Sequence, residues 1–213
     1  MRNRFEIEME ELELDLIKMG NIGEVMLKKL LAALETRNLD LAKEIIKMDK
    51  DIDEYEISIE KKCLGLIALQ QPIAIDLRKI GSILKIITDI ERVGDYVVNI
   101  AEILVEFGGE EYIKPLVDLP KMILIVEEML KKSLDSFIKL DDKLAIETAK
   151  RDDEIDDLYE RIYEELLEMV NKENKKQVIN LLLMGRYLER AADHITNICE
   201  RNIYIVTGER MYF

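Results

Sequence analysis

Apolar residues recur at every third or fourth position along most of the chain, which is the spacing of one buried helix face. Two clear examples are the runs Ile73, Leu77, Ile80, Leu84, Ile87 and Leu158, Ile162, Leu166, Met169. No stretch alternates apolar and polar residues with a period of two. The pattern therefore predicts helices and no strands.

Turn-forming residues divide this pattern into six predicted helices, at roughly 4–36, 39–69, 72–106, 119–139, 142–170 and 175–206. Gly108-Gly109, followed by Pro115 and Pro120, marks the clearest linker. We predict a first three-helix bundle at 1–108, a linker at 109–120 and a second bundle at 121–213. Gly20 and Gly23 are expected to weaken or kink the first helix, because a helical Gly costs about 0.5–1 kcal/mol relative to Ala.

The two halves of the chain resemble each other. Residues 24–56 align with 127–159 at an offset of 103, with 13 identities in 33 positions. Residues 89–102 align with 187–200 at an offset of 98, with 6 identities in 14 positions. The change of offset falls between the second and third helix of each half, where a loop can differ in length. The predicted fold is all-α, a tandem repeat of two three-helix bundles.

Charge narrows the classes of partner. The chain carries 31 Lys and Arg against 45 Asp and Glu, a formal net charge of −14. Nucleic acid and anionic lipid are bound by clustered positive charge, so neither is expected as a direct partner. No window is apolar enough to insert into a membrane, and the first residues lack the apolar core of a signal peptide. We expect a cytoplasmic protein in which Cys63 and Cys199 are buried free thiols.

Acidic residues four positions apart occur at matching places in both halves. The first half has Asp49 with Asp53 and Glu91 with Asp95, and the second half has the copies Asp152 with Asp156 and Glu189 with Asp193. Residues at this spacing share one helix face. One such pair means little in a chain with 45 acids, so the signal is the repetition. Glu91 and Asp95 also continue the apolar stripe of their helix and are expected at core positions.

Four carboxylates facing one another across two helices would repel, and like charges raise each other's pKa values. A bound multivalent cation removes that repulsion. An all-oxygen site favours Mg, Ca, Mn or iron over a zinc site built from Cys and His. The alternative is a network of ion pairs, for which Arg92, Arg190, Arg78, Arg151 and Arg186 lie nearby in sequence.

Other candidate chemistry is sparse. The single histidine, His194, aligns with Tyr96 in the first half, so it cannot belong to a repeated ligand set and is expected to be structural. Asn99 and Asn197 follow Asp95 and Asp193 by one turn and could join helices or support ligands. No phosphate-cradling Gly-rich loop or Glu-x-x-His motif of di-iron bundles is present. An enzyme is therefore not expected, and a carboxylate-bridged metalloenzyme is the weaker alternative.

The acidic motifs carry a family resemblance. The segments Asp89–Asp95 with Asn99–Glu102, and Arg186–His194 with Asn197, resemble the two repeated motifs of the PhoU family, and the segment 71–78 is similar to the family's turn between helices two and three. The resemblance implies two three-helix bundles and metal on the acidic motifs, with iron expected first and Mn, Mg, Ca or Zn as alternatives. Its ligands would be Asp49, Asp53, Glu91 and Asp95, then Asp152, Asp156, Glu189 and Asp193.

The resemblance also implies a function. PhoU proteins are phosphate-transport accessory proteins, and in bacteria they are negative regulators that couple a phosphate ABC transporter to a sensor kinase. The expected partners are the transporter's ATPase subunit and a sensor histidine kinase, with a homodimer as the expected assembly. Regulation of a different phosphate permease, or a purely structural bundle, are the alternatives. The repeated lysines Lys28-Lys29 and Lys131-Lys132 are considered as a partner surface, although a solvated face is the favoured interpretation.

Overall fold

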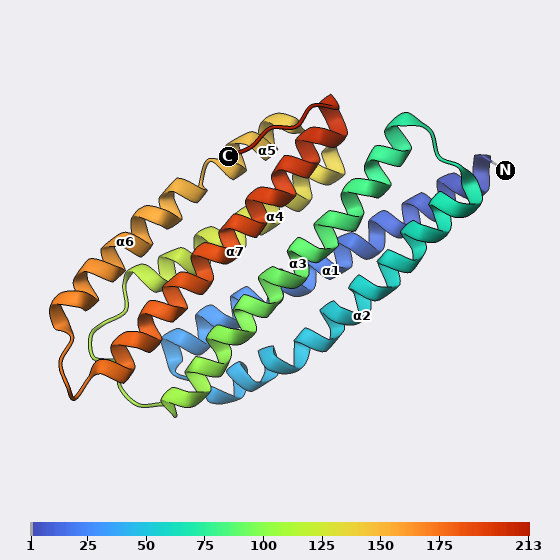
Figure 1. Cartoon of the computed structure of the whole chain (residues 1–213). Coiled ribbons are helices and arrows are strands. Elements are labelled where there is room, and N and C mark those ends of the chain that lie inside the picture. The colour runs from blue at the N-terminus through green and yellow to red at the C-terminus, as the bar shows by residue number, and fades with distance from the viewer. Residues whose placement is uncertain (1) are drawn as a thin grey trace.

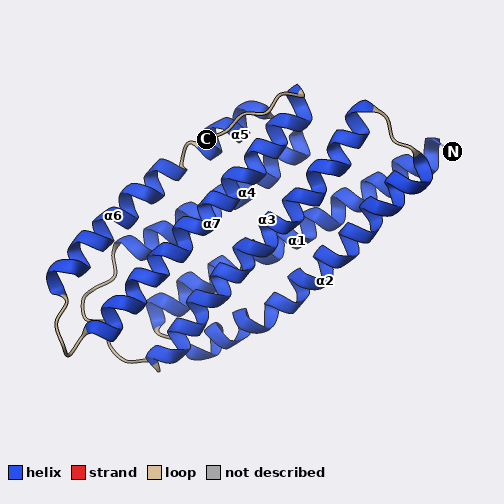
Figure 2. Ribbon diagram, viewed as in Figure 1, coloured by secondary structure: helices blue, strands red, loops and turns tan. Residues whose placement is uncertain are grey.

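The computed structural model describes residues 2–213, with side chains from residue 4 onward. Within this range the chain forms seven helices and no strand (Figure 2). The helices are α1 (Arg2–Thr36), α2 (Leu39–Gln70), α3 (Ala74–Phe107), α4 (Asp118–Lys139), α5 (Asp142–Ala149), α6 (Asp152–Met169) and α7 (Lys175–Thr207). The all-α prediction is confirmed, and none of the described helices is long and apolar enough to cross a membrane.

Local sequence explains most of the helix boundaries. Asn38 caps α2, with its side-chain oxygen accepting hydrogen bonds from the backbone N–H groups of Asp40 and Leu41. Gln71 ends α2 in the left-handed conformation, and Pro72 follows, as is common after a helix end. At the next boundary, Leu140 ends α4 in the left-handed region and the Asp141 side chain caps α5.

One predicted helix is divided in the structure. The segment expected at 142–170 is interrupted at Lys150 and Arg151, so α5 and α6 together take the place that α2 holds in the first half. The acids Asp152, Asp153 and Glu154 then form the first turn of α6. Negative charge is stabilised at a helix N-terminus, so this acidic run favours a new helix start at that point. The Arg151 side chain holds the break through contacts with Glu128 on α4 at 2.5 Å and Glu154 at 3.1 Å.

The two three-helix units lie side by side along their length (Figure 1). Contacts between the units run chiefly through α3 with α7 and α1 with α4, while α2 flanks one side and α5–α6 the other. Figure 1 shows that α3 and α7 run antiparallel next to each other. One continuous cluster of buried apolar side chains extends through both units, from Leu12 on α1 to Ile205 on α7. The units therefore share a core.

Helix α1 continues through Gly20 and Gly23 without a break in its hydrogen-bonded length. A Cβ atom at Gly20 would lie 2.4 Å from a methyl carbon of Leu134, and one at Gly23 would lie 3.1 Å from a methyl carbon of Leu130. Both leucines belong to α4 in the other unit. These glycines allow the two units to pack closely.

The pairing of α3 with α7 has approximate twofold symmetry. At the offset of 98, Asp89 corresponds to Tyr187 and Tyr96 corresponds to His194. The rings of Tyr96 and Tyr187 stack with centroids 5.9 Å apart, and His194 Nδ1 lies 2.8 Å from Asp89 Oδ1. Each contact is the counterpart of the other with the two halves exchanged. The two contacts are therefore related by an approximate twofold axis, but one is a stacked pair of tyrosine rings and the other joins a histidine to an aspartate.

Candidate metal centres

The first acidic group lies at a close approach of α2 and α3. Gly94 on α3 marks the approach, since a Cβ at this position would lie 2.9 Å from the Ile52 Cδ1 atom and 3.8 Å from the Asp49 Oδ1 atom. Asp49 therefore faces α3 at the turn that carries Glu91 and Asp95. Two helices that touch at a glycine bring their carboxylates to the same short stretch of the bundle.

Glu91 and Asp95 are more exposed to solvent than the predicted core positions would be. Their side chains are 16% and 35% exposed, while Ile90, Val93 and Val97 on the same helix are buried. The helical period of 3.6 residues rotates the acids to the edge of the apolar stripe. They lie at the border of core and solvent, where a carboxylate is partly desolvated and still reachable from outside.

The electrostatic environment links the four acids of this group. Burial, with the charge of Asp95 as the next cause, raises the pKa of Glu91 to about 7, and Asp53 acts in the same direction while Arg92 opposes it. Burial followed by the charges of Asp53 and Asp95 raises the pKa of Asp49. The structure therefore brings Asp49, Asp53, Glu91 and Asp95 within range of mutual repulsion, as the spacing predicts.

The second group repeats this arrangement between α6 and α7. Burial, then the charges of Asp193, Asp156 and Glu189, raise the pKa of Asp152 to about 7. The pKa of Asp156 is raised by burial and by Asp193, and the pKa of Glu189 is raised by burial and by Asp193 and Asp156, with Arg186 opposing. All eight predicted acids thus form two groups of four, one in each half.

Three buried carboxylate oxygens have no hydrogen-bond partner among the described residues: Glu91 Oε2, Asp152 Oδ1 and Glu189 Oε2. A buried carboxylate oxygen without a donor is costly, and a cation would stabilise it. The donor set is all oxygen, which suits a hard or borderline divalent or trivalent ion. The residues present therefore fit a metal, although no three His, Cys, Asp or Glu side chains in the described part of the chain already converge enough to hold one. Binding would require these side chains to rotate toward the ion.

Arginines pair with some of these acids. Arg92 Nη1 lies 2.7 Å from Asp95 Oδ2 and its Nε lies 3.3 Å from Glu91 Oε2, while Arg186 pairs with Glu189. Arg92 and Arg186 do not occupy equivalent positions, because the counterpart of Arg92 is Arg190.

The other arginines considered in the ion-pair alternative have different contacts. Arg190 lies over the ring of Tyr96, with its Cζ 5.1 Å from the centroid. Arg151 pairs with Glu128 and Glu154, and Arg78 donates to the backbone oxygen of Ile205 at 3.4 Å. The arginine after the glutamate is duplicated with the acids, as Arg92 and Arg190, but its ion pairs with the acids are not: Arg92 pairs with Glu91 and Asp95, whereas Arg186 pairs with Glu189. This difference in pairing favours a role for the acids beyond ion pairing.

His194 and Asn197 join the two halves. Asn197 Nδ2 donates to Asp89 Oδ1 at 3.4 Å, the same oxygen that His194 Nδ1 approaches. The structural reading of His194 and the interhelical reading of Asn197 therefore hold. Both cysteines are buried as predicted, and burial raises the pKa of Cys63 to about 12 and the pKa of Cys199 further still.

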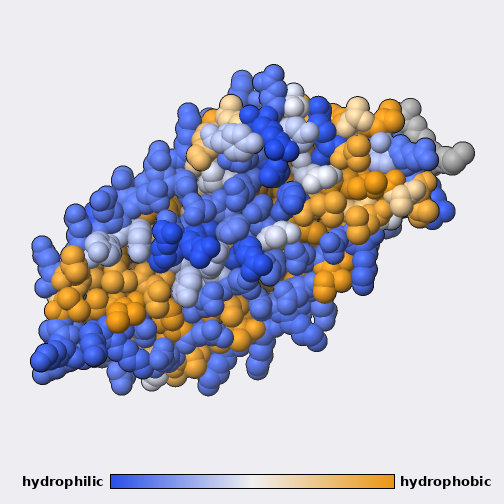
Figure 3. All heavy atoms as spheres, in the orientation of Figure 1, coloured by the Kyte–Doolittle hydropathy of each residue, from blue (hydrophilic) through white to orange (hydrophobic). Residues whose placement is uncertain are grey.

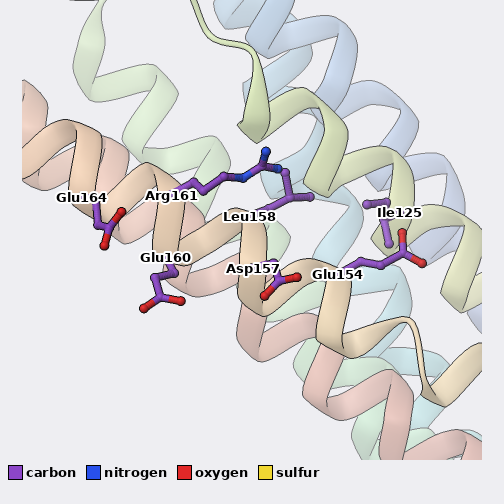
Figure 4. Close-up of a pocket in the computed structure, with 7 residues that line it drawn as sticks. All are labelled: Ile125, Glu154, Asp157, Leu158, Glu160, Arg161 and Glu164. Atoms are coloured by element: carbon purple, nitrogen blue, oxygen red, sulfur yellow. The ribbon is translucent and has the colours of Figure 1, made fainter.

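A different acidic hollow, of about 640 Å³, lies on the outer side of α6. Its lining includes Glu154, Asp157, Glu160, Glu164 and Arg161 (Figure 4). Figure 4 shows that these carboxylates come from successive turns of α6 and spread along it without converging. This hollow is separate from Asp152 and Asp156. At the offset of 103 its counterpart in the first half is a hollow lined by Ile22, Asp51, Glu54, Tyr55 and Ser58.

Comparison with known proteins gives the family. The PhoU domain matches residues 16–104 and again 119–201. The chain is 40% identical to the phosphate-specific transport system accessory protein PhoU homolog of Clostridium acetobutylicum, over 99% of this chain and 97% of that protein. It is 31% identical to the phosphate-specific transport system accessory protein PhoU of Escherichia coli, over 97% of this chain and 86% of that protein.

Solved structures agree with the sequence comparison. The crystal structure of PhoU from Pseudomonas aeruginosa superposes with a TM-score of 0.92 at 31% identity, over 96% of this chain and 100% of that one. The phosphate transport system regulatory protein PhoU from Streptococcus pneumoniae superposes with a TM-score of 0.90 at 31% identity, over 98% and 100%. The duplicated helical unit, its paired acidic motifs and these matches along both halves show that the chain belongs to the PhoU family.

Proposed function

We propose that this protein is a cytoplasmic accessory protein of a phosphate transport system that lowers phosphate uptake and represses phosphate-starvation genes when phosphate is plentiful. The observation that carries the proposal is the match to named accessory proteins along both halves of the chain, over 97–99% of its length. The proposed contacts are the ATPase subunit of a phosphate ABC transporter and a sensor histidine kinase, with a homodimer as the active assembly.

Deletion of the gene tests the regulatory part. Expression of phosphate-scavenging genes should rise in phosphate-rich medium, and the gene supplied in trans should restore repression. Unchanged expression would contradict the proposal. Co-purification of a phosphate-transporter ATPase subunit with the tagged protein tests the contact, and co-purification of a subunit from another phosphate permease would favour that alternative regulator.

The proposed contact surface is the apolar group at the turn between α2 and α3. Leu69 and Ile73 are 80% and 77% exposed, and Ile75 and Leu77 are also exposed. Figure 3 shows apolar atoms gathered over this end of the molecule. Exposed apolar clusters of this kind often mark contact surfaces. The double substitution Leu69→Ser with Ile73→Ser should reduce recovery of the ATPase subunit, with Leu124→Ser, an exposed leucine on α4, as the control.

The lysines considered for this role are engaged within the protein. Lys28 lies 3.3 Å from Glu127 on α4 and 3.6 Å from Glu24, and Lys29 lies 2.6 Å from Glu44 on α2. Lys132 lies 2.8 Å from Glu128. These contacts support an internal role for the repeated lysines, and the apolar turn is the stronger candidate for the partner surface.

We further propose that each acidic group binds metal, with iron as the first candidate and Mn, Mg, Ca or Zn as alternatives. Bound metal would supply the positive charge that the repelling carboxylates lack. Asp152 Oδ1 and Glu189 Oε2, which are buried and have no hydrogen-bond donor among the described residues, support this proposal for the second half. The repetition of the four acids extends it to the first half, where Arg92 Nε lies 3.3 Å from Glu91 Oε2. Glu91→Ala should lower the metal content of the first half alone, and Glu189→Ala that of the second half alone.

Elemental analysis after equilibrium dialysis measures that loss. Asp51→Ala and Glu160→Ala remove exposed acids from α2 and α6 outside the two groups, and should leave the metal content unchanged. Each single variant should lose half of the metal bound per chain, and loss of all the metal in either single variant would contradict two independent sites. A metal-free wild-type protein after dialysis against each ion would contradict the metal proposal without touching the regulatory one.

A further inference from the structure

We propose that a pocket between the N-terminal end of α3 and the C-terminal end of α7 binds a phosphate group, either as free inorganic phosphate or as the phosphate of a small ester. The pocket has a volume of about 310 Å³, and its lining includes Arg78, Ser82, Lys85, Arg201, Tyr204 and Arg210. These two helix ends meet because α3 and α7 run antiparallel (Figure 1). The inference does not depend on the proposed regulatory function or on the metal sites.

The charge of this pocket is opposite to that of the whole protein. The chain has 45 acids against 31 Lys and Arg, yet the lining contains four cations and no acid. Elsewhere in the described chain, many Lys and Arg side chains form ion pairs with nearby carboxylates. None of Arg78, Lys85, Arg201 and Arg210 forms an ion pair with any residue between positions 4 and 213. Four uncompensated positive charges around one cavity favour an anionic ligand.

Three polar atoms of the same lining are buried and have no hydrogen-bond partner in the described chain: Arg78 Nε, Arg201 Nε and Ser82 Oγ. Ser82 is only 2% exposed. Buried donors of this kind are normally satisfied by protein or ligand. The three side chains that carry these unsatisfied donors line one pocket, which favours a ligand with several acceptor oxygens.

Contacts with the C-terminal end of α7 position Arg78 in the pocket lining. The guanidinium carbons of Arg78 and Arg210 each lie 6.0 Å from the centre of the Tyr204 ring. Arg78 also donates to the backbone oxygen of Ile205 at 3.4 Å. A Cβ at Gly208 would lie 2.4 Å from Arg78 Nη1, so this glycine leaves room for the guanidinium. The cation is thereby positioned by the end of α7 while its Nε remains unsatisfied.

The approximate twofold axis supplies an internal comparison. At the offset of 98, Arg78 corresponds to Lys176 and Tyr204 corresponds to Glu106. At that opposite end of the α3–α7 pair, Lys176 Nζ lies 2.9 Å from Glu106 Oε1. The same place in the other half is thus neutralised by an internal ion pair, and only the end bearing Arg78 keeps its positive charge.

Phosphate suits this donor set better than a carboxylate does. Arginine presents a planar fork that pairs with two phosphate oxygens, and a tetrahedral phosphate offers further oxygens to Ser82 and Lys85. A phosphate near neutral pH carries more negative charge than a carboxylate and offsets more of the four cations. The cavity is at the lower limit of small-molecule pockets, about 300–1,000 Å³, so a phosphate or a small phosphate ester is the expected size.

Isothermal titration calorimetry of the full chain, pretreated with a chelator so that metal-bound phosphate does not contribute, tests this inference. Inorganic phosphate and AMP are the probes, and acetate at equal ionic strength is the control anion. We expect saturable phosphate binding with a Kd at or below about 1 mM. Arg201→Gln and the double variant Lys85→Gln with Arg210→Gln should each weaken it at least about tenfold, since each removes a charge-assisted hydrogen bond.

Lys176→Gln is the matched control, because it removes the cation at the symmetry-related place, and it should leave phosphate affinity unchanged. Circular dichroism melting separates loss of binding from loss of folding, and Arg78→Gln is held in reserve because its contact with Ile205 also holds the fold. AMP binding more than tenfold tighter than phosphate would identify an ester as the ligand, and equal affinity would identify free phosphate. The inference is overturned if phosphate does not bind, if acetate binds equally, or if Lys176→Gln weakens binding as much as the pocket variants do.

Discussion

Replacing Glu91 by Gln should stabilise the metal-free protein at pH 8. Glutamine has the shape of a protonated glutamate and no charge, so it removes the repulsion that raises the pKa of Glu91 from 4.5 to about 7. A carboxyl whose folded pKa lies above its unfolded pKa favours the folded state fully below pH 4.5, and that contribution is lost as the pH rises to 7. The gain from Glu91→Gln should therefore be near zero at pH 4 and complete at pH 8.

The magnitude follows from the shift. A change from 4.5 to about 7 corresponds to roughly 3 kcal/mol at about 1.4 kcal/mol per pKa unit. The Glu91 side chain keeps 16% of its surface in water, so solvent screening reduces this value. We expect a gain of about 2 kcal/mol in the free energy of unfolding at pH 8. For a chain of this length that corresponds to a rise in Tm of roughly 4–8 °C.

Calorimetric melting at pH 4, 6 and 8, first with a chelator and then with added metal, measures this effect. Metal that binds only the folded state stabilises the wild type by about 2.7 kcal/mol at one hundred times its Kd. Glu91→Gln should lose much of the stabilisation that metal gives through the first group. The advantage of the variant over the wild type in Tm should therefore shrink or reverse when metal is added. Asp51→Asn, an exposed acid on α2, should show neither effect.

The refuting result is clear. If Glu91→Gln lowers Tm at pH 8 in the presence of the chelator, then the contacts of Glu91 with Arg92 stabilise the fold more than burial and repulsion destabilise it. In that case the acids of the first half are ion-paired structural residues, and the metal proposal loses its electrostatic basis. An equal change at pH 4 and pH 8 would show that the effect is packing and not charge.

Three further predictions follow from packing and burial. Gly20→Ala should lower the free energy of unfolding by about 1 kcal/mol, because the new Cβ would lie 2.4 Å from a methyl carbon of Leu134 on α4. Gly65→Ala should raise it by about 0.5–1 kcal/mol, because a Cβ there meets no atom within 4 Å. Urea unfolding measures both changes, and changes of the same sign would contradict the packing argument. Gly94→Ala should push α2 from α3 and lower the metal bound per chain by up to half, because only the first acidic group is affected; elemental analysis measures this, and an unchanged metal content would show that binding does not need the close approach. Cys63 and Cys199 should react with a thiol reagent at pH 8 only after denaturation, because both are buried with raised pKa values; rapid reaction of the folded protein would contradict their burial.

Helix type and order were predictable because their signals are local. Asn38, Pro72 and the Gly108-Gly109 pair mark boundaries that the structure places within a few residues. The break at Lys150 and Arg151 is not predicted because no Gly or Pro marks it, and the run of charged residues at 150–154 is also compatible with the exposed face of one continuous helix. The cause is the acidic run at the start of α6 and the contact of Arg151 with Glu128, and only the second of these depends on a distant element.

Tertiary packing changed the reading of other residues. From its sequence context, Gly20 is expected to be a weak point in a helix. The structure shows that the absence of a side chain at Gly20 leaves room for Leu134 of α4. The two acidic groups were predictable because the duplication repeats them. The basic pocket was not, because Arg78 and Arg201 are far apart in sequence and only the antiparallel packing of α3 on α7 brings them to one cavity.

The approximate twofold axis between the halves has a consequence for how this molecule can change. In a symmetric homodimer every substitution occurs twice, once on each side of the axis. Here the two sides are encoded separately, so a stacked tyrosine pair can face an Asp89–His194 contact across the axis. Likewise Lys176 is paired with Glu106 at one end while Arg78 has no acidic partner among the described residues at the other. Fusion of the two copies into one chain thus allows one end to specialise while the other keeps the bundle together.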